Sequence, residues 1–157
     1  MKAKTKKEPD WIIYCDGAWG FVGTGAAAII ISPSGVKMRY AARLEFQCTN
    51  NIAEYEAVLL GLRKARAMGI QSLIIKTDSQ VVAGHIENDC KARDLELAKY
   101  LQFLREQEKY FEGFTIKNIS RTDNSDVDEI AKAAAENTSL PQDVFFPVLT
   151  HASIKSK

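Results

Sequence analysis

The sequence predicts a single α/β domain in which a mixed β-sheet is covered by helices on both faces. Three observations lead to this fold class. The chain has 157 residues, of which 46% are hydrophobic, a size at which one domain buries most of its unfolded surface. It begins with short apolar runs joined by turns, and strand-like and helix-like patterns then alternate. Such an order requires a mixed sheet with helices on both sides.

The opening meander comprises expected strands over residues 11–16, 25–32 and 36–44. The first joins β-favouring residues to Asp16-Gly17, which is typical of a buried strand that ends in a carboxylate. Ser32-Pro33-Ser34-Gly35 separates the next two strands, because proline and glycine occupy typical turn positions there. Short turns between three such runs predict antiparallel pairing.

The remaining elements alternate in type. A long helix is expected over residues 51–68, because Thr49-Asn50-Asn51 is a typical opening and Gly69 a typical stop. The dense apolar run at 72–77 predicts a central strand that ends next to Asp78. Apolar periodicity predicts further helices over 79–87, 94–110 and 125–136, and a strand over 114–119. The expected order is therefore βββαβααβα.

Two terminal segments lie outside this pattern, so we expect the folded domain to span residues 11–137. Residues 1–10 form a lysine-rich arm that we expect to be disordered, with a nucleic-acid contact as the alternative. Residues 138–157 contain two prolines and no clear period, and we expect a tail or a linker. Phe145 and Phe146 are apolar enough to pack back on the domain.

Composition narrows the function classes. The 21 basic and 20 acidic residues give a net charge of +1, which alone gives no reason to expect nucleic acid. If bound cations neutralise some of the acids, the remaining surface is basic. No apolar run is long enough for a membrane span, and we see no signal segment. Three cysteines without a Cys-x-x-Cys spacing argue against structural zinc and favour a reducing, intracellular compartment.

Four carboxylates occupy positions where a site can form. Asp16 and Asp78 follow strand runs, whereas Glu54 and Asp128 lie in the first turns of the long helix and the last helix. Each also has a structural explanation of its own. Asp16-Gly17 is a common hairpin-turn dipeptide, Glu54 fits a capping box, Asp78 fits an N-cap, and Asp128 suits the positive end of a helix.

Taken together, these acids favour a metal site. In mixed sheets, sites form where strands end, so the four side chains can meet at one edge. Close carboxylates raise one another's pKa unless a cation lies among them. Because no histidine or cysteine cluster accompanies them, these oxygen ligands favour Mg²⁺ or Mn²⁺ over zinc.

Four segments resemble the signature segments of type 1 ribonuclease H, in their usual order and at compatible spacing. They are Cys15-Asp16-Gly17, Thr49-Asn50-Asn51-Ile52-Ala53-Glu54, Thr77-Asp78-Ser79-Gln80 and Arg121-Thr122-Asp123-Asn124-Ser125-Asp126-Val127-Asp128-Glu129-Ile130-Ala131. The similarity covers residues 11–135. Without a basic insertion between the middle helices, the chain resembles the compact archaeal-type branch, also found in plant proteins and long-terminal-repeat retroelements. The resemblance implies the ribonuclease H fold, a five-stranded mixed sheet with its first three strands antiparallel, flanked by helices.

The resemblance also implies an endonuclease that hydrolyses the RNA strand of RNA/DNA hybrids with two Mg²⁺ ions, for which Mn²⁺ can substitute. Asp16 would bridge both ions, Asp128 would complete the ion that holds the attacking water, and Glu54 with Asp78 would complete the other. The products would carry 5′-phosphate and 3′-hydroxyl ends. Besides the hybrid, a neighbouring reverse transcriptase domain is an expected partner, and a membrane is not.

By the same resemblance, nine residues would contact the hybrid. The backbone of Gly17, Ala18 and Trp19 and the side chains of Asn50, Asn51, Ser79 and Gln80 would meet ribose or bases, and Thr49 and Arg121 would meet phosphates. For the two asparagines, a helix-opening turn is an equal alternative. Arg121 lies in the loop where the bacterial pattern has a histidine, and we expect no role for His85 or His151.

Two other functions stay open. One is a ribonuclease-H-like module that binds nucleic acid or protein without cutting, although such a module need not keep four costly carboxylates. The other is a transposase or integrase on the same fold, whose last acid is typically a glutamate well downstream. In the last helix, Asp128 adjoins Val127 and Ala131 and is expected to face the site, whereas Asp126 is expected to face solvent.

Overall fold

The computed structural model describes residues 10–88, 95–136, 143–145, 147–149 and 152–154, without the side chains of 85–88. Residues 1–9 of the lysine-rich arm, Cys90 and His151 lie outside the described residues, as does the side chain of His85. The helices and strands follow the predicted order, and two short strands are added near the C-terminus.

The strands of the described chain are β1 (Trp11–Trp19), β2 (Thr24–Ile31), β3 (Lys37–Leu44), β4 (Ser72–Thr77), β5 (Gly113–Asn118), β6 (Val144–Phe145) and β7 (Val148–Leu149). The helices are α1 (Asn50–Ala67), α2 (Gln80–Asn88), α3 (Leu95–Glu108) and α4 (Ser125–Glu136), with a 3₁₀ turn at Thr122–Asn124 before α4. Among the described residues, no helix combines the length and the apolar character needed to cross a membrane.

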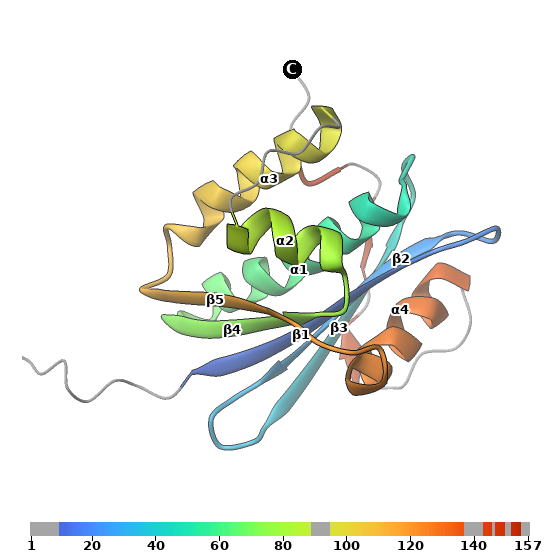
Figure 1. Cartoon of the computed structure of the whole chain (residues 1–157). Coiled ribbons are helices and arrows are strands. Elements are labelled where there is room, and N and C mark those ends of the chain that lie inside the picture. Colours follow the sequence, from blue (N-terminus) through green and yellow to red (C-terminus); the bar gives the residue numbers. More distant parts are fainter. Residues whose placement is uncertain (1–9, 89–94, 137–142, 146, 150–151, 155–157) are drawn as a thin grey trace, which may run out of the picture.

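Five long strands build the sheet in the order β5-β4-β1-β2-β3 (Figure 1). β1, β2 and β3 pair antiparallel, whereas β4 is parallel to β1 and β5 is parallel to β4. The predicted mixed sheet with an antiparallel start is therefore confirmed. β6 and β7, of two residues each, pair with β3 and extend the sheet beyond the five expected strands.

Helices cover both faces of the sheet, with α1, α2 and α3 on one face and α4 on the other (Figure 1). The larger core lies between the sheet and α1, where Tyr55 and Tyr100 of α3 stack with ring centroids 5.6 Å apart. The smaller core joins Ile29 of β2 to Val127 and Ile130 of α4. Because α1 is buried along most of its length, packing fixes the position of its first turns.

β1 extends three residues beyond the strand that the sequence predicts. Asp16 pairs with Ala27 and Gly17 with Ala26 in β2, and the hairpin turn lies at residues 20–23. The expectation that the strand ends at Asp16 is therefore wrong, and so is the alternative that Asp16-Gly17 forms the turn. Glycine suits position 17 because a Cβ there would lie only 2.5 Å from the Ala53 carbonyl carbon of α1.

The described parts of the C-terminal segment pack on the domain. β6 and β7 run parallel to β3. Phe145 stacks on Tyr40 with ring centroids 5.4 Å apart, and Asp143 Oδ2 lies 2.6 Å from Arg39 Nη1. These contacts pair part of an edge strand whose backbone groups would otherwise be open to solvent.

Candidate active site

Asp16 owes its position to the pairing of β1 with β4. The two strands are parallel, with Cys15 beside Thr77, and β4 ends at Thr77. Asp16 therefore lies one residue beyond the position at which β4 ends, and Asp78 is the residue that follows β4. Asp16 is only 3% exposed. The parallel register places two carboxylates at one edge of the sheet, as expected of such sheets.

Glu54 reaches β1 from the start of α1. The N-cap of α1 is Thr49, whose Oγ1 accepts a hydrogen bond from the Ile52 N–H at 3.2 Å. Glu54 lies too far into the helix to complete a capping box, so that structural explanation is wrong. Instead, its Oε1 accepts a hydrogen bond from the backbone N–H of Gly17 at 3.1 Å. The close approach that Gly17 permits is therefore what brings Glu54 next to Asp16.

Asp78 follows β4 but does not cap α2. Ser79 has that role, because its Oγ accepts a hydrogen bond from the Val82 N–H at 3.2 Å. Asp78 Oδ2 instead lies 3.4 Å from the side-chain Nδ2 of Asn124, which also donates to the Cys15 carbonyl at 3.0 Å. The buried Asn124 thus ties the start of α4 to β1 and holds Asp78 at the sheet edge.

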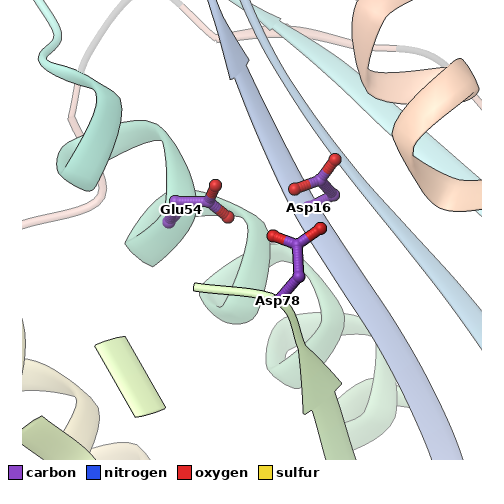
Figure 2. Close-up of side chains that lie close together, drawn as sticks. All are labelled: Asp16, Glu54 and Asp78. Carbon is purple, nitrogen blue, oxygen red and sulfur yellow. The ribbon is translucent and has the colours of Figure 1, made fainter. Parts of the chain in front are cut away.

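These three carboxylates form one cluster (Figure 2). One ligand oxygen from each of Asp16, Glu54 and Asp78 lies within 4.8 Å of the other two. Burial raises the pKa of Asp16 to about 9, and the neighbouring acids add to this effect. Burial also raises the pKa of Glu54 to about 8, although the Gly17 N–H opposes it. The surroundings therefore do not stabilise Asp16 and Glu54 in their ionised forms.

The donor set fits a hard divalent cation. In an octahedral Mg²⁺ site with metal–oxygen distances of about 2.1 Å, ligand oxygens lie roughly 3–4 Å apart. In the structure, the ligand oxygens of the three carboxylates lie within 4.8 Å of one another. Small side-chain rotations would bring these oxygens to the separations of such a site. A bound cation would also favour the ionised forms of Asp16 and Glu54, and so oppose the burial and the repulsion that raise their pKa values. Within the described part of the chain, this group includes no nitrogen or sulfur ligand.

Asp128 lies in the same cleft but outside this cluster. It shares a hydrogen bond with Asp16, and its Oδ2 lies 3.0 Å from Lys132 Nζ, one turn further along α4. Burial alone would raise its pKa, but the hydrogen bonds from Asp16 and Lys132 outweigh burial and lower it. Asp128 is therefore the ionised member of its hydrogen-bonded pair with Asp16, and it also forms an ion pair with Lys132.

Two clefts meet at the carboxylates. One, of about 360 Å³, is lined by Gly17, Ala18 and Trp19 on the β1 side and by Asp128 and Lys132 on α4. The other, of about 570 Å³, is lined by Asn50, Asn51, Ser79 and Gln80. Asn50, Glu54, Asp78 and Arg121 line both clefts. Eight of the nine expected contact residues thus face one groove, and the ninth, Thr49, caps α1.

Several further residues of the first cleft were not predicted as contacts, among them Lys132, Phe21 and Val22. Lys132 lies four residues after Asp128, a spacing that favours ion pairs on a helix and was available in the sequence. A hairpin turn usually has glycine or asparagine at the positions of Phe21 and Val22, and this departure could also have been recognised in the sequence. The two asparagines at the start of α1 do not cap it, because Thr49 does.

A model of the reverse-transcriptase-like family matches residues 15–134, a span that includes all four carboxylates. The chain belongs to this family. Among curated proteins, this reverse-transcriptase-like chain is 27% identical over 126 residues to a ribonuclease HI of Halobacterium salinarum, covering 79% of the chain and 63% of the relative. It is 31% identical over 138 residues to the uncharacterized protein YpeP of Bacillus subtilis, covering 80% and 59%. It thus spans less than two thirds of either relative.

Solved structures share the fold of this reverse-transcriptase-like chain. RNase H1 of Halobacterium salinarum superposes with a TM-score of 0.75 at 24% identity, covering 80% of this chain and 97% of that one. LC11-RNase H1, isolated from compost, gives 0.74 at 21% identity, covering 82% and 96%. LC11-RNase H1 in complex with an RNA/DNA hybrid gives 0.71 at 20%, covering 82% and 96%. The resemblance to type 1 ribonuclease H and the predicted fold are confirmed.

Proposed function

We propose that this chain is a divalent-metal-dependent ribonuclease H that cuts the RNA strand of RNA/DNA hybrids. The observation that carries the proposal is the cluster of Asp16, Glu54 and Asp78 at the meeting point of two clefts. A relative named ribonuclease HI and a similar structure that holds an RNA/DNA hybrid support the same activity. A family member that only binds would have no use for buried carboxylates that repel one another.

In this proposal Asp16, Glu54, Asp78 and Asp128 hold two Mg²⁺ ions, for which Mn²⁺ substitutes. When bound, the ions supply an activated water and stabilise the leaving oxygen, so that the products carry 5′-phosphate and 3′-hydroxyl ends. The Gly17 N–H and the Asn124 amide keep Glu54 and Asp78 in place. Asp128 would hold metal through the carboxylate that lies 3.0 Å from Lys132 Nζ in this structure, and Lys132 would then give up that contact.

The groove supplies the contacts that recognise a ribose strand. The first turns of α1 and α2 reach the second cleft, where the positive ends of the two helices suit phosphate or hydroxyl oxygens. Asn50, Ser79 and Gln80 are short polar groups on the same wall, and such groups read a 2′-hydroxyl in a wide minor groove. Arg121 lies where both clefts meet and suits the phosphate next to the cleavage point.

The cell compartment and partners belong to the same proposal. The free thiols Cys15 and Cys48 favour a reducing, intracellular setting, and burial raises the pKa of Cys48 to about 12, which keeps that thiol unreactive. A reverse transcriptase domain is a candidate neighbour, in keeping with the family that the chain matches.

The proposal is tested by offering three duplexes side by side. End-labelled RNA/DNA, RNA/RNA and DNA/DNA duplexes of one sequence are incubated with the protein in Mg²⁺, in Mn²⁺ and in EDTA. We expect cleavage of the RNA strand of the hybrid alone, with either metal, and none in EDTA. Ligation and phosphatase treatment then identify the ends. Binding of the hybrid without cleavage in either metal would contradict the proposal and favour a non-cutting binding module.

Asp128 and Asp126 provide a matched pair of variants on α4. Asp128 lines the cleft, whereas Asp126 is exposed two residues earlier. We expect Asp128→Asn to lower hybrid cleavage by about 100-fold or more, because a metal ligand is lost, and Asp126→Asn to stay within a few fold of the wild type. Initial rates at saturating Mg²⁺ measure both. Equal losses in the two variants would show that Asp128 is not part of the site.

A further inference from the structure

The tip of the β1–β2 hairpin is unusually apolar. Gly20 donates its N–H to the Gly23 carbonyl at 3.0 Å, which leaves Phe21 and Val22 at the two corners of the turn. Corner positions normally carry glycine, asparagine or aspartate. Phe21 is fully exposed, Val22 is 65% exposed, and the preceding Trp19 is 58% exposed. Three large apolar side chains are therefore exposed to solvent at one turn, where the usual preferences for turn residues would not place them.

The base of the β1–β2 hairpin packs against α4, although its tip is exposed to solvent. A Cβ at Gly23 would lie 2.5 Å from the Ala135 carbonyl oxygen, so this glycine lets β2 rest directly on the end of α4. Arg43 Nη1 donates to the carbonyls of Ala134 and Ala135 at 3.1 and 2.7 Å, and so ties β3 to the same turn of helix. The hairpin consequently projects at a set position beside the end of α4 (Figure 1).

The exposed tip is one end of the groove that holds the carboxylates. Trp19, Phe21 and Val22 line the same cleft as Asp16 and Asp128. At the opposite end, the second cleft runs over the starts of α1 and α2. The acidic cluster lies between these two ends, and the cations Arg121 and Lys132 flank it.

We propose that the tip, Phe21 with Val22 and Trp19, packs against sugars and base edges in the minor groove of the nucleic-acid duplex and so strengthens substrate binding. This inference rests on the proposed nuclease function. Basic groups next to exposed aromatic side chains are typical of surfaces that bind nucleic acid, where cations contact phosphates and apolar groups contact sugars and bases. A patch of three side chains is also too small for a stable protein interface.

The test removes the apolar tip and leaves the metal site intact. For Phe21→Ala/Val22→Ala we expect the KM for the RNA/DNA hybrid to rise about 10-fold, because contacts of this kind contribute to substrate binding. kcat should stay within about threefold, since neither side chain touches the reacting atoms. The melting temperature should not change, because both side chains are exposed. The matched control is Val36→Ala, which removes an apolar side chain that is 57% exposed in the β2–β3 turn at the other end of the sheet.

A binding measurement separates this inference from the nuclease proposal. Fluorescence anisotropy of a labelled hybrid is followed in an Asp16→Asn background with Mg²⁺. A weaker affinity on removal of the tip supports the inference even if the wild type does not cut. An unchanged affinity and KM, or no binding of the hybrid in either background, would overturn it. So would a wild type that forms dimers which the double variant loses while its hybrid affinity stays the same, because the tip would then be a contact between copies of this chain.

Discussion

Asp16→Asn is expected to reduce hybrid cleavage by about 1000-fold or more and, in metal-free buffer, to raise the melting temperature of the protein. The loss of activity follows from removing the acid that interacts with each of the other three. The gain in stability follows because Asp16, buried next to Glu54, Asp78 and Asp128, must bind a proton on folding at neutral pH, a cost that the neutral amide does not have. Initial rates in Mg²⁺ and thermal unfolding in EDTA measure the two effects.

The same variant tests the pH dependence of stability. Asp16 and Glu54 have folded-state pKa values of about 9 and 8, raised from ordinary values of 3.8 and 4.5. Between about pH 5 and pH 8 the folded protein therefore binds more protons than the unfolded chain, and stability falls as pH rises through this range in EDTA. Asp16→Asn should make that fall shallower. If the wild type gained stability with rising pH, or if the variant lost stability in EDTA, the charge repulsion described here would be wrong.

Deletion of residues 138–157 is expected to destabilise the domain by about 3–5 kcal/mol, because it uncovers a buried carboxylate. Glu56 is fully buried in α1. Its Oε1 accepts from Ser153 Oγ at 2.5 Å, and its Oε2 accepts from the Ser153 N–H at 2.9 Å and from Tyr100 Oη at 2.5 Å. Burial and the charge of Glu56 raise the pKa of Tyr100, which keeps its phenol a donor. Without the C-terminal segment, Glu56 keeps Tyr100 and loses both bonds from Ser153.

Urea unfolding at pH 7 measures this effect, and two point variants calibrate it. Ser153→Ala removes one of the hydrogen bonds to Glu56 and should cost about 1–2 kcal/mol. Ser34→Ala, in the exposed β2–β3 turn, removes a hydrogen bond between two exposed hydroxyls and should change stability by less than about 0.5 kcal/mol. If the shortened protein were as stable as the full chain, the C-terminal segment would be a dispensable tail and the domain would end near residue 137.

Local signals were sufficient for most of the fold. Turn residues, helix stops and apolar periodicity place each long strand and helix within a few residues of where it lies, because those features act over short stretches of chain. The end of β1 was missed because Asp16-Gly17 is a common turn dipeptide. What keeps these residues in the strand is the approach of Ala53, which depends on packing between distant segments.

The same distinction applies to the site and to the C-terminal segment. The sequence pointed to Asp16, Glu54 and Asp78 because two strands were expected to end, and one helix to start, at a shared edge, and the structure brings the three side chains together. It could not show that Asp16 engages Asp128, since that depends on the rotation of α4, whereas the contact between Lys132 and Asp128 follows from their spacing along one helix. β6 and β7 have two residues each, too few for any period, and only pairing with β3 makes them strands.

The central claim is that Asp16, Glu54 and Asp78 together bind divalent metal. Anomalous diffraction from crystals soaked in Mn²⁺ tests it most directly, because the signal locates the ion without reference to activity. We expect a peak within coordination distance of oxygens from all three carboxylates, and its loss in crystals of Asp16→Asn. A well-ordered cluster with no Mn²⁺ peak at millimolar metal, or a peak that persists unchanged in the variant, would contradict the account.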